Sequence, residues 1–201
     1  MIKTHRASAL DRSWQLIQRL AQADSRLHLV QNKLPRPELM ALYAACDVFV
    51  SLHRAEGFGR NIAEALLLGL DVIATDHGGN VDFRLPPLAH LVESYPLALR
   101  SGDYPHHEGQ CWGQPSEKEA TKLMRQIAER RLAVGDAQRF DTYPKRNPGV
   151  MAAYQEQFSV TAAGARYRDR LEDLWGQRQE LAGRLRWGEK AVSANPLKSV
   201  D

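Results

Sequence analysis

The stretch between residues 48 and 75 restricts the fold more than any other part of the chain. Val48–Leu52 is a short apolar, β-branched run of the kind found in buried strands. A glycine-bearing loop leads into a helical pattern over about Arg60–Leu68, and Gly69 suits the left-handed residue that ends such a helix. Val72–Thr75 predicts a second strand. A strand, a helix and a strand in this order predict a βαβ unit.

The alternation of helical and strand patterns extends to both sides of this unit. Upstream, apolar residues at helical spacing around Leu16 are followed by a strand at Leu27–Val30 and by a helix that begins near Pro37. Downstream we expect a strand at Leu91–Val92, and then a loop. The loop contains four aromatic or histidine residues, which are Tyr104, His106, His107 and Trp112. The pattern predicts an α/β fold with a Rossmann-like parallel sheet flanked by helices.

The C-terminal part is expected to be largely helical. Ser116 and Glu119 form a capping-box pattern that opens a helix. Residues 132–158 are expected to be irregular. A long helix over about Ser159–Leu181 is expected next, and residues 191–201 are expected to form a loose tail. We therefore divide the chain into a Rossmann-like domain, residues 1–155, and a C-terminal helix with its tail, residues 156–201.

Composition excludes several classes of partner. The chain has 201 residues and a net charge of +3, which gives no basis for a nucleic-acid partner. It contains no apolar run near the roughly 18 residues of a membrane helix, and its N-terminus lacks the apolar core of a signal peptide. Cys46 and Cys111 stand in no metal or redox spacing, so we expect them reduced. These features predict a cytoplasmic protein without a transmembrane segment.

The loop before the helix at residue 60 is suited to an anion. Ligands of open parallel sheets gather at the carboxyl ends of the strands, where the next helix directs unpaired N–H groups outward. Gly57 and Gly59 would allow a diphosphate to approach the main chain closely. Arg60 and Asn61 would add a cation and the first helical N–H groups. The sequence therefore predicts a phosphate-binding loop here.

Two glutamates flank this loop. Glu64 lies one helical turn inside a helix whose neighbouring positions are almost all apolar, and an unpartnered buried charge would be costly. Its carboxylate could accept hydrogen bonds from the two vicinal hydroxyls of a ribose. Glu56, on the loop, could reach a second polyol. The two acids would then bracket a nucleotide-sugar.

The segment His53–Glu64, with seven residues between Glu56 and Glu64, resembles the paired-glutamate motif of the family-four retaining glycosyltransferases of the GT-B fold. Residues 46–50 and 75–80 resemble the segments that flank this motif in that family. The resemblance covers roughly residues 1–180 and implies the C-terminal, donor-binding half of such an enzyme, with a nucleotide diphosphate hexose as donor. It implies no cofactor and no metal.

The resemblance also implies roles for single residues. Glu56 and Arg60 are expected to act in catalysis, Glu56 beside the hydroxyls of the donor sugar, and Glu64 is expected to hold the ribose. The other residues expected to bind the donor are Gly57, Phe58, Gly59, Asn61, Leu34, Gly79 and Asn80. His53 is either a further sugar contact or a histidine that is hydrogen-bonded at the end of a strand. His106 and His107 lack metal-ligand spacing and receive no role.

The chain also departs from the family pattern. In the family, an acceptor-binding domain precedes the donor-binding half, and here Ile2–His5 already resembles the second strand of that half. We therefore expect a fragment of a longer enzyme or a chain that needs a separate acceptor-binding domain. The alternative is a non-catalytic nucleotide-sugar-binding remnant or subunit. An apolar side of the last helix, with Tyr167, Leu171 and Trp175, could contact such a partner or be a solvated face.

Overall fold

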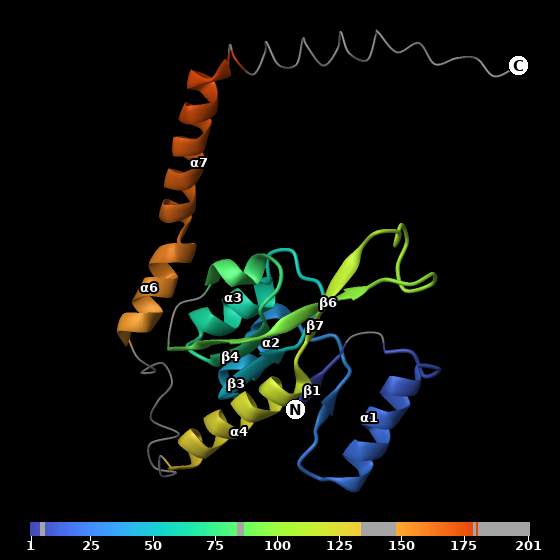
Figure 1. Ribbon diagram of the computed structural model, residues 1–201. Coiled ribbons are helices and arrows are strands. Elements are labelled where there is room, and N and C mark those ends of the chain that lie inside the picture. The colour runs from blue at the N-terminus through green and yellow to red at the C-terminus, as the bar shows by residue number, and fades with distance from the viewer. Residues whose placement is uncertain (5–6, 84–86, 134–147, 179, 181–201) are drawn as a thin grey trace, which may run out of the picture.

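The computed structural model describes residues 1–4, 7–83, 87–133, 148–178 and 180. Its N-terminal part is a small parallel unit (Figure 1) in which β1 (Ile2–Lys3) pairs with β2 (Leu29–Val30), and α1 (Arg12–Ala23) connects them. The Asp11 carboxylate caps α1 by accepting hydrogen bonds from two main-chain N–H groups of its first turn.

The centre of the molecule is a parallel three-stranded sheet in the order β3-β4-β5. Its elements follow each other as α2 (Arg36–Ala44), β3 (Val48–Ser51), α3 (Arg60–Leu67), β4 (Asp71–Thr75), the 3-10 helix η1 (Gly79–Phe83) and β5 (Ala89–Val92). Gly69 has the left-handed φ of 76° that the sequence predicts after α3. The predicted βαβ unit and the α/β fold with parallel sheets flanked by helices are confirmed.

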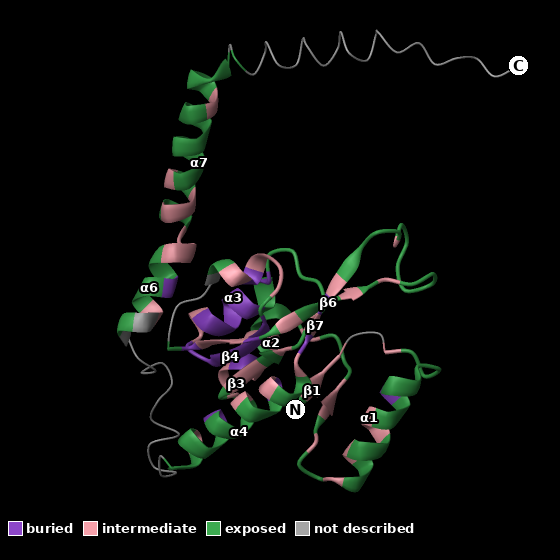
Figure 2. Ribbon diagram, viewed as in Figure 1, coloured by how far each residue is buried: buried purple, intermediate pink, exposed green. Residues whose placement is uncertain are grey.

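Helices cover both faces of this sheet. Val72 and Ala74 of β4 pack in one cluster with α3 and with Tyr43 of α2, whereas Ile73 faces the opposite cluster with α4 (Glu117–Ala133). This alternation follows from the two-residue period of a strand. Figure 2 shows that burial concentrates in β4 and α3. The core thus lies between α3 and β4.

A buried charge cluster fixes one end of β4. Asp71 is 1% exposed and accepts hydrogen bonds from His90 (2.8 Å), Arg130 (2.7 Å) and Arg131 (2.6 Å). Burial alone would raise the pKa of Asp71, but the hydrogen bonds from His90 and Arg131 and the charges of both arginines lower that pKa to about 2. The cluster ties α4 and β5 to the same end of β4.

The low pKa of Asp71 predicts a loss of stability in acid. In the unfolded chain this carboxyl group has its ordinary pKa of 3.8, so the folded state gains stability from it above that pH and loses it as the pH falls toward 2. The contribution is about 2 kcal/mol. Urea denaturation in steps from pH 5 to pH 3 should show the free energy of unfolding falling more steeply than in Asp71→Asn. Equal slopes for the two proteins would contradict the assignment.

Residues 93–115 contain an antiparallel hairpin, and the prediction of a loop there is partly wrong. β6 (Ser94–Ala98) pairs with β7 (Cys111–Pro115), and Trp112 belongs to β7. Pro96 and Gly113 obscure the alternation of apolar and polar residues that marks a strand. Tyr104, His106 and His107 do lie in the connection between the two strands.

α4 begins as predicted, but its capping box is only half formed. The Ser116 hydroxyl accepts from the Glu119 N–H (3.3 Å). The Glu119 carboxylate accepts from the N–H of Glu93 instead of that of Ser116, and the Ser116 N–H donates to the Glu93 carbonyl. The glutamate that the pattern assigns to the cap therefore anchors α4 to the end of β5.

A helix lies inside the segment that the sequence predicts to be irregular. α6 (Pro148–Phe158) packs on α3, and Tyr154 is fully buried in the core. That part of the prediction is wrong because α6 is stabilised by tertiary contacts, of Tyr154 with the core and of Phe158 with Phe58, rather than by helical periodicity. Residues 134–147 lie outside the described residues, and the division predicted between residues 155 and 156 falls within this helix.

The last described helix is α7 (Val160–Gly176), which Ser159 caps through a hydrogen bond from the Ala162 N–H. Its start agrees with the prediction, whereas Leu181 and the expected tail lie outside the described residues. Figure 1 shows α7 leading away from the sheets, and it buries no residue. Tyr167, Leu171 and Trp175 are exposed. None of the described helices is long and apolar enough to span a bilayer.

Candidate functional site

The candidate site begins at the turn between β3 and α3, which we call the glycine loop (residues 56–61). Gly59 precedes α3 with a left-handed φ of 81°, a conformation that glycine adopts without strain. Its N–H donates to the Glu56 carboxylate at 3.1 Å. Arg60 and Asn61, the first two helical residues, are exposed. The loop therefore presents a helix start, one carboxylate and one guanidinium to solvent.

Glu64 lies one turn deeper in α3 and is almost fully buried. Its side chain is 11% exposed, and Oε1 accepts a hydrogen bond from Arg36 Nη1 at 2.8 Å. The same oxygen lies 3.8 Å from Arg60 Nε. The carboxylate is thus directed toward the cation of the glycine loop and toward the first residue of α2. The buried charge that the sequence predicts in α3 has its partner in Arg36.

Arg36 is the part of this arrangement that sequence reasoning missed. It is 28 positions from Glu64, and only the packing of α2 beside α3 brings the two side chains together. Tyr43 of α2 also lies near the carboxylate: burial first, and secondly the charge of Glu64, raises the pKa of the Tyr43 phenol. The sequence did indicate that Glu64 needs a cation as partner, because its neighbours in the helix are apolar. It did not indicate which cation.

The loop that follows β4 and contains Gly78 and Gly79 packs tightly against the glycine loop. The Gly79 N–H approaches the Glu56 carbonyl at 3.4 Å. A Cβ at Gly79 would lie 1.9 Å from the Gly57 carbonyl oxygen, and one at Gly78 would lie 2.4 Å from that of Glu56. The two turns that follow β3 and β4 therefore meet main chain to main chain, which only glycine permits here.

His53 and Asn80 hold this pair of loops together. His53 Nε2 lies 2.9 Å from the His77 carbonyl and 3.0 Å from Asn80 Oδ1, so it carries the proton. His53 Nδ1 lies 3.1 Å from the Ser51 hydroxyl, and buried Asn80 donates to the Thr75 carbonyl. His53 is therefore hydrogen-bonded through both ring nitrogens just after β3, as one of its two alternatives predicts.

The remaining predicted residues lie at the edges of the site. Phe58 is 57% exposed and contacts Phe158 of α6 edge to face, with ring centroids 6.3 Å apart. Asn61 lines a cavity between β1 and β3. Leu34, just before α2, is partly buried. Among the described residues, no group of three or more His, Cys, Asp or Glu could hold a metal ion.

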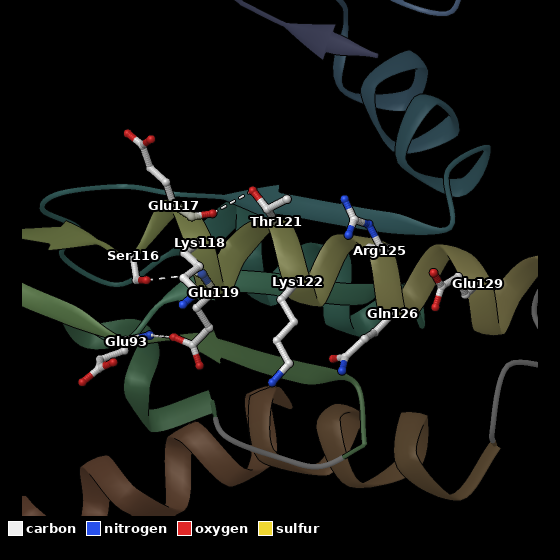
Figure 3. Close-up of a pocket in the computed structure, with 10 residues that line it drawn as sticks. All are labelled: Glu93, Ser116, Glu117, Lys118, Glu119, Thr121, Lys122, Arg125, Gln126 and Glu129. Carbon is white, nitrogen blue, oxygen red and sulfur yellow. Dashed lines mark hydrogen bonds between the residues drawn. The ribbon is translucent and has the colours of Figure 1, made fainter.

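A separate hollow of about 750 Å³ lies along α4 (Figure 3). Figure 3 shows its polar and charged side chains, with Lys122 and Gln126 directed to one side of the helix and Glu117 to another. Glu93 and Glu119 at its end make the anchoring contact of α4 described above. None of the predicted site residues lines it, so we assign it no part in the candidate site.

Comparison with known proteins agrees with the resemblance at the coarser level. Residues 17–84 match the family model described as Glycosyl transferases group 1. A stretch of 52 residues is 40% identical to the protein named "Putative glycosyltransferase 45" of Sulfolobus islandicus filamentous virus (isolate Iceland/Hveragerdi). This stretch is 26% of the chain but spans only 15% of the viral protein. The family match includes β2, α2, β3, α3 and β4, and with them the glycine loop and Glu64. Residues 17–84 thus carry a glycosyl transferases group 1 domain.

Proposed function

We propose that the chain binds a nucleotide diphosphate hexose at the glycine loop and, together with an acceptor-binding domain, transfers the hexose with retention of configuration. The observation that carries this proposal is the Glu64 carboxylate, held at 2.8 Å from Arg36 and 3.8 Å from Arg60 at the start of α3. The carboxylate can accept hydrogen bonds from the hydroxyl groups of a sugar, and the neighbouring helix start and cations can bind phosphate. Those are the two chemistries that a nucleoside diphosphate requires.

Different residues of the site are assigned to the diphosphate, the ribose and the hexose of the donor. Main-chain N–H groups of Gly57 to Asn61 other than that of Gly59, which donates to Glu56, bind the diphosphate together with the Arg60 guanidinium. The diphosphate must be stabilised as negative charge develops on it. Glu64 accepts from the ribose hydroxyls, and Glu56 accepts from the hexose. In retaining transfer the acceptor hydroxyl attacks C1 of the hexose from the face that the diphosphate leaves and passes its proton to the departing diphosphate, so both groups must be held on the same face of the sugar. Gly79 and Asn80 support the loop from below.

The acceptor would be a glycan, a lipid-linked sugar or a small molecule, and its binding is assigned to a separate domain or chain. The alternative function, a donor-binding subunit without turnover of its own, predicts the same nucleotide binding. The two are distinguished by incubating the purified chain with a panel of nucleotide diphosphate hexoses and measuring release of nucleoside diphosphate. Release above the uncatalysed rate supports the enzyme. Binding without release assigns the isolated chain to the alternative.

The role of Glu64 is tested by Glu64→Gln with Arg36→Gln as the matched control. Both changes break the Arg36–Glu64 ion pair, but only the first removes the charged acceptor for the ribose. We expect Glu64→Gln to weaken binding of a nucleoside diphosphate by about 2 kcal/mol, the scale of hydrogen bonds to a charged group. Calorimetric titration measures both variants. An equal loss in Arg36→Gln would assign the effect to the ion pair and remove the ribose contact.

The role of Glu56 is tested by Glu56→Gln. The amide keeps an oxygen that can accept from the Gly59 N–H, so the turn before α3 is retained. We expect affinity for the nucleotide diphosphate hexose to fall about tenfold, because hydrogen bonds to a charged acceptor are worth roughly 1.5 kcal/mol or more. Affinity for the free nucleoside diphosphate should be unchanged. Equal losses for the two ligands, measured by the same titration, would refute the division.

A further inference from the structure

The base of the β6–β7 hairpin lies against the segment that leads into the glycine loop. The Gly113 N–H of β7 donates to the Arg54 carbonyl at 2.9 Å. Gly113 stands opposite Pro96 of β6, so this hydrogen bond is made on the edge of β7 that β6 leaves open. Arg54 is two residues before Glu56 in the sequence. Figure 1 shows the other end of the hairpin projecting away from the sheets. The hairpin base is thus a third neighbour of the candidate site.

The Arg54 side chain is held by two residues of β7. Its Nε donates to Gln114 Oε1 at 2.7 Å, and its guanidinium carbon lies 5.5 Å from the centroid of the Trp112 ring. Residues two positions apart in a strand share a face, so Trp112 and Gln114 present an aromatic ring and an amide side by side. The ring attracts the cation, and the amide oxygen fixes its orientation. Together with the Gly113 hydrogen bond, these contacts fix both the main chain and the side chain of Arg54.

The other face of β7 contacts the loop that follows β4. A Cβ at Gly113 would lie 2.4 Å from His77 Cγ, so the His77 ring packs directly on the main chain of β7. The Ser94 hydroxyl of β6 donates to the Asp76 carbonyl at 3.0 Å. The hairpin therefore contacts both of the loops that meet at the candidate site.

The position of Glu56 depends on contacts of this kind. The structure describes residues 52–59 as a connection without a helix or strand, so its main-chain path depends on neighbouring elements. Two sets of contacts hold it just before Glu56: those of His53 with the loop after β4, and those of Arg54 with β7. The Glu56 side chain is exposed, so the main chain determines where its carboxylate lies.

We propose that Trp112 and Gln114 are positioning residues of the donor site, which place the Glu56 carboxylate toward the hexose by holding Arg54. The inference rests on the proposed function, because the hexose is assigned to Glu56 there. Neither residue is assigned a contact with the ligand. Loss of their contacts would displace Glu56 but leave the start of α3, and with it the diphosphate site, in place.

The first test needs no ligand. The Gly59 N–H donates to the Glu56 carboxylate, so its exchange with solvent, measured by NMR, reports the position of that carboxylate. Trp112→Ala/Gln114→Ala should make this amide exchange at least about fivefold faster. Trp112→Phe keeps a ring beneath Arg54 and should leave the exchange unchanged. The matched control is Tyr104→Ala, which removes an exposed ring from the connection between β6 and β7 and should have no effect.

The second test measures binding of the hexose donor by calorimetric titration. The ligands are the best-bound of UDP-glucose, ADP-glucose and GDP-mannose, and the corresponding free nucleoside diphosphate. Trp112→Ala/Gln114→Ala should bind the hexose donor about fivefold more weakly, a smaller loss than in Glu56→Gln, because a displaced carboxylate keeps part of its hydrogen bonding. Affinity for the free nucleoside diphosphate should be unchanged. The same two changes added to Glu56→Gln should cause no further loss, since they act through that carboxylate.

The outcomes separate the positioning role from the proposed function. The role is overturned if the Gly59 amide is unchanged in Trp112→Ala/Gln114→Ala, or if the loss of hexose affinity adds to that of Glu56→Gln. Equal losses for the hexose donor and the free nucleoside diphosphate also overturn it, because they indicate a general distortion of the glycine loop. A faster Gly59 amide in a chain that binds none of the donors supports the hold on Glu56 and contradicts the proposed function alone. If the double variant does not fold, Gln114→Ala, which removes only the 2.7 Å hydrogen bond, gives the same readouts.

Discussion

Asp71→Asn is expected to lower the free energy of unfolding by about 3 kcal/mol, because it removes the negative charge at the centre of a buried ionic cluster. The Asp71 carboxylate is 1% exposed and accepts from both Arg130 and Arg131 within 2.7 Å. The amide that replaces it is neutral and would turn an N–H₂ group toward one of these cations. Urea denaturation at pH 7, followed by circular dichroism, measures the change.

The matched control is Arg130→Gln. Arg130 is 54% exposed, so its ion pair is partly screened by water, and Arg131 and His90 still donate to the carboxylate when it is removed. We expect a loss of under about 1 kcal/mol. If Asp71→Asn costs no more than Arg130→Gln, then the carboxylate does not hold β4, β5 and α4 together in the way described.

Gly79→Ala is expected to lower the free energy of unfolding by a similar amount, through a steric clash instead of a lost ion pair. The new Cβ would stand 1.9 Å from the Gly57 carbonyl oxygen, and a backbone atom cannot move aside as a flexible side chain can. The two loops must separate, at a cost of about 3 kcal/mol in the free energy of unfolding. Because the glycine loop moves with them, binding of a nucleoside diphosphate should also weaken. Thermal unfolding and calorimetric titration measure the two effects.

Gly57→Ala controls for the loss of a glycine as such. A Cβ at Gly57 meets no atom within 4 Å, and its φ is outside the left-handed region. Its stability should therefore change by less than about 0.5 kcal/mol. A Gly79→Ala protein as stable as Gly57→Ala would show that the two loops do not make the close main-chain contact described here.

The sequence predicted those features that depend on local chemistry. Strands β3 and β4 were predictable from short apolar runs, the turn at Gly69 from its position after a helix, and the buried charge of Glu64 from its apolar neighbours. The confirmed α/β fold follows from these elements. Each of them is determined by residues within a few positions of one another.

Features that depend on distant contacts could not be predicted. Arg36 meets Glu64 across 28 positions, and α6 is stabilised by packing of Tyr154 against α3 rather than by its own periodicity. The hairpin of β6 and β7 was hidden by Pro96 and Gly113, which break the alternation of a strand. The roles of all the predicted site residues remain predictions, namely those of Glu56, Arg60, Glu64, Gly57, Phe58, Gly59, Asn61, His53, Leu34, Gly79 and Asn80.

We propose that the glycine loop and Glu64 form a single pocket for a nucleotide diphosphate hexose, and all the ligand-binding predictions depend on this pocket. The most direct test is a titration of the isotope-labelled chain with a panel of nucleoside diphosphates, followed by NMR. We predict that one of them shifts the main-chain amides of Gly57–Asn61 and the Arg36 and Arg60 side-chain signals together, with a single dissociation constant, and that Glu64→Gln weakens the response. Binding that shifts other parts of the chain and leaves residues 56–64 unchanged would contradict the claim.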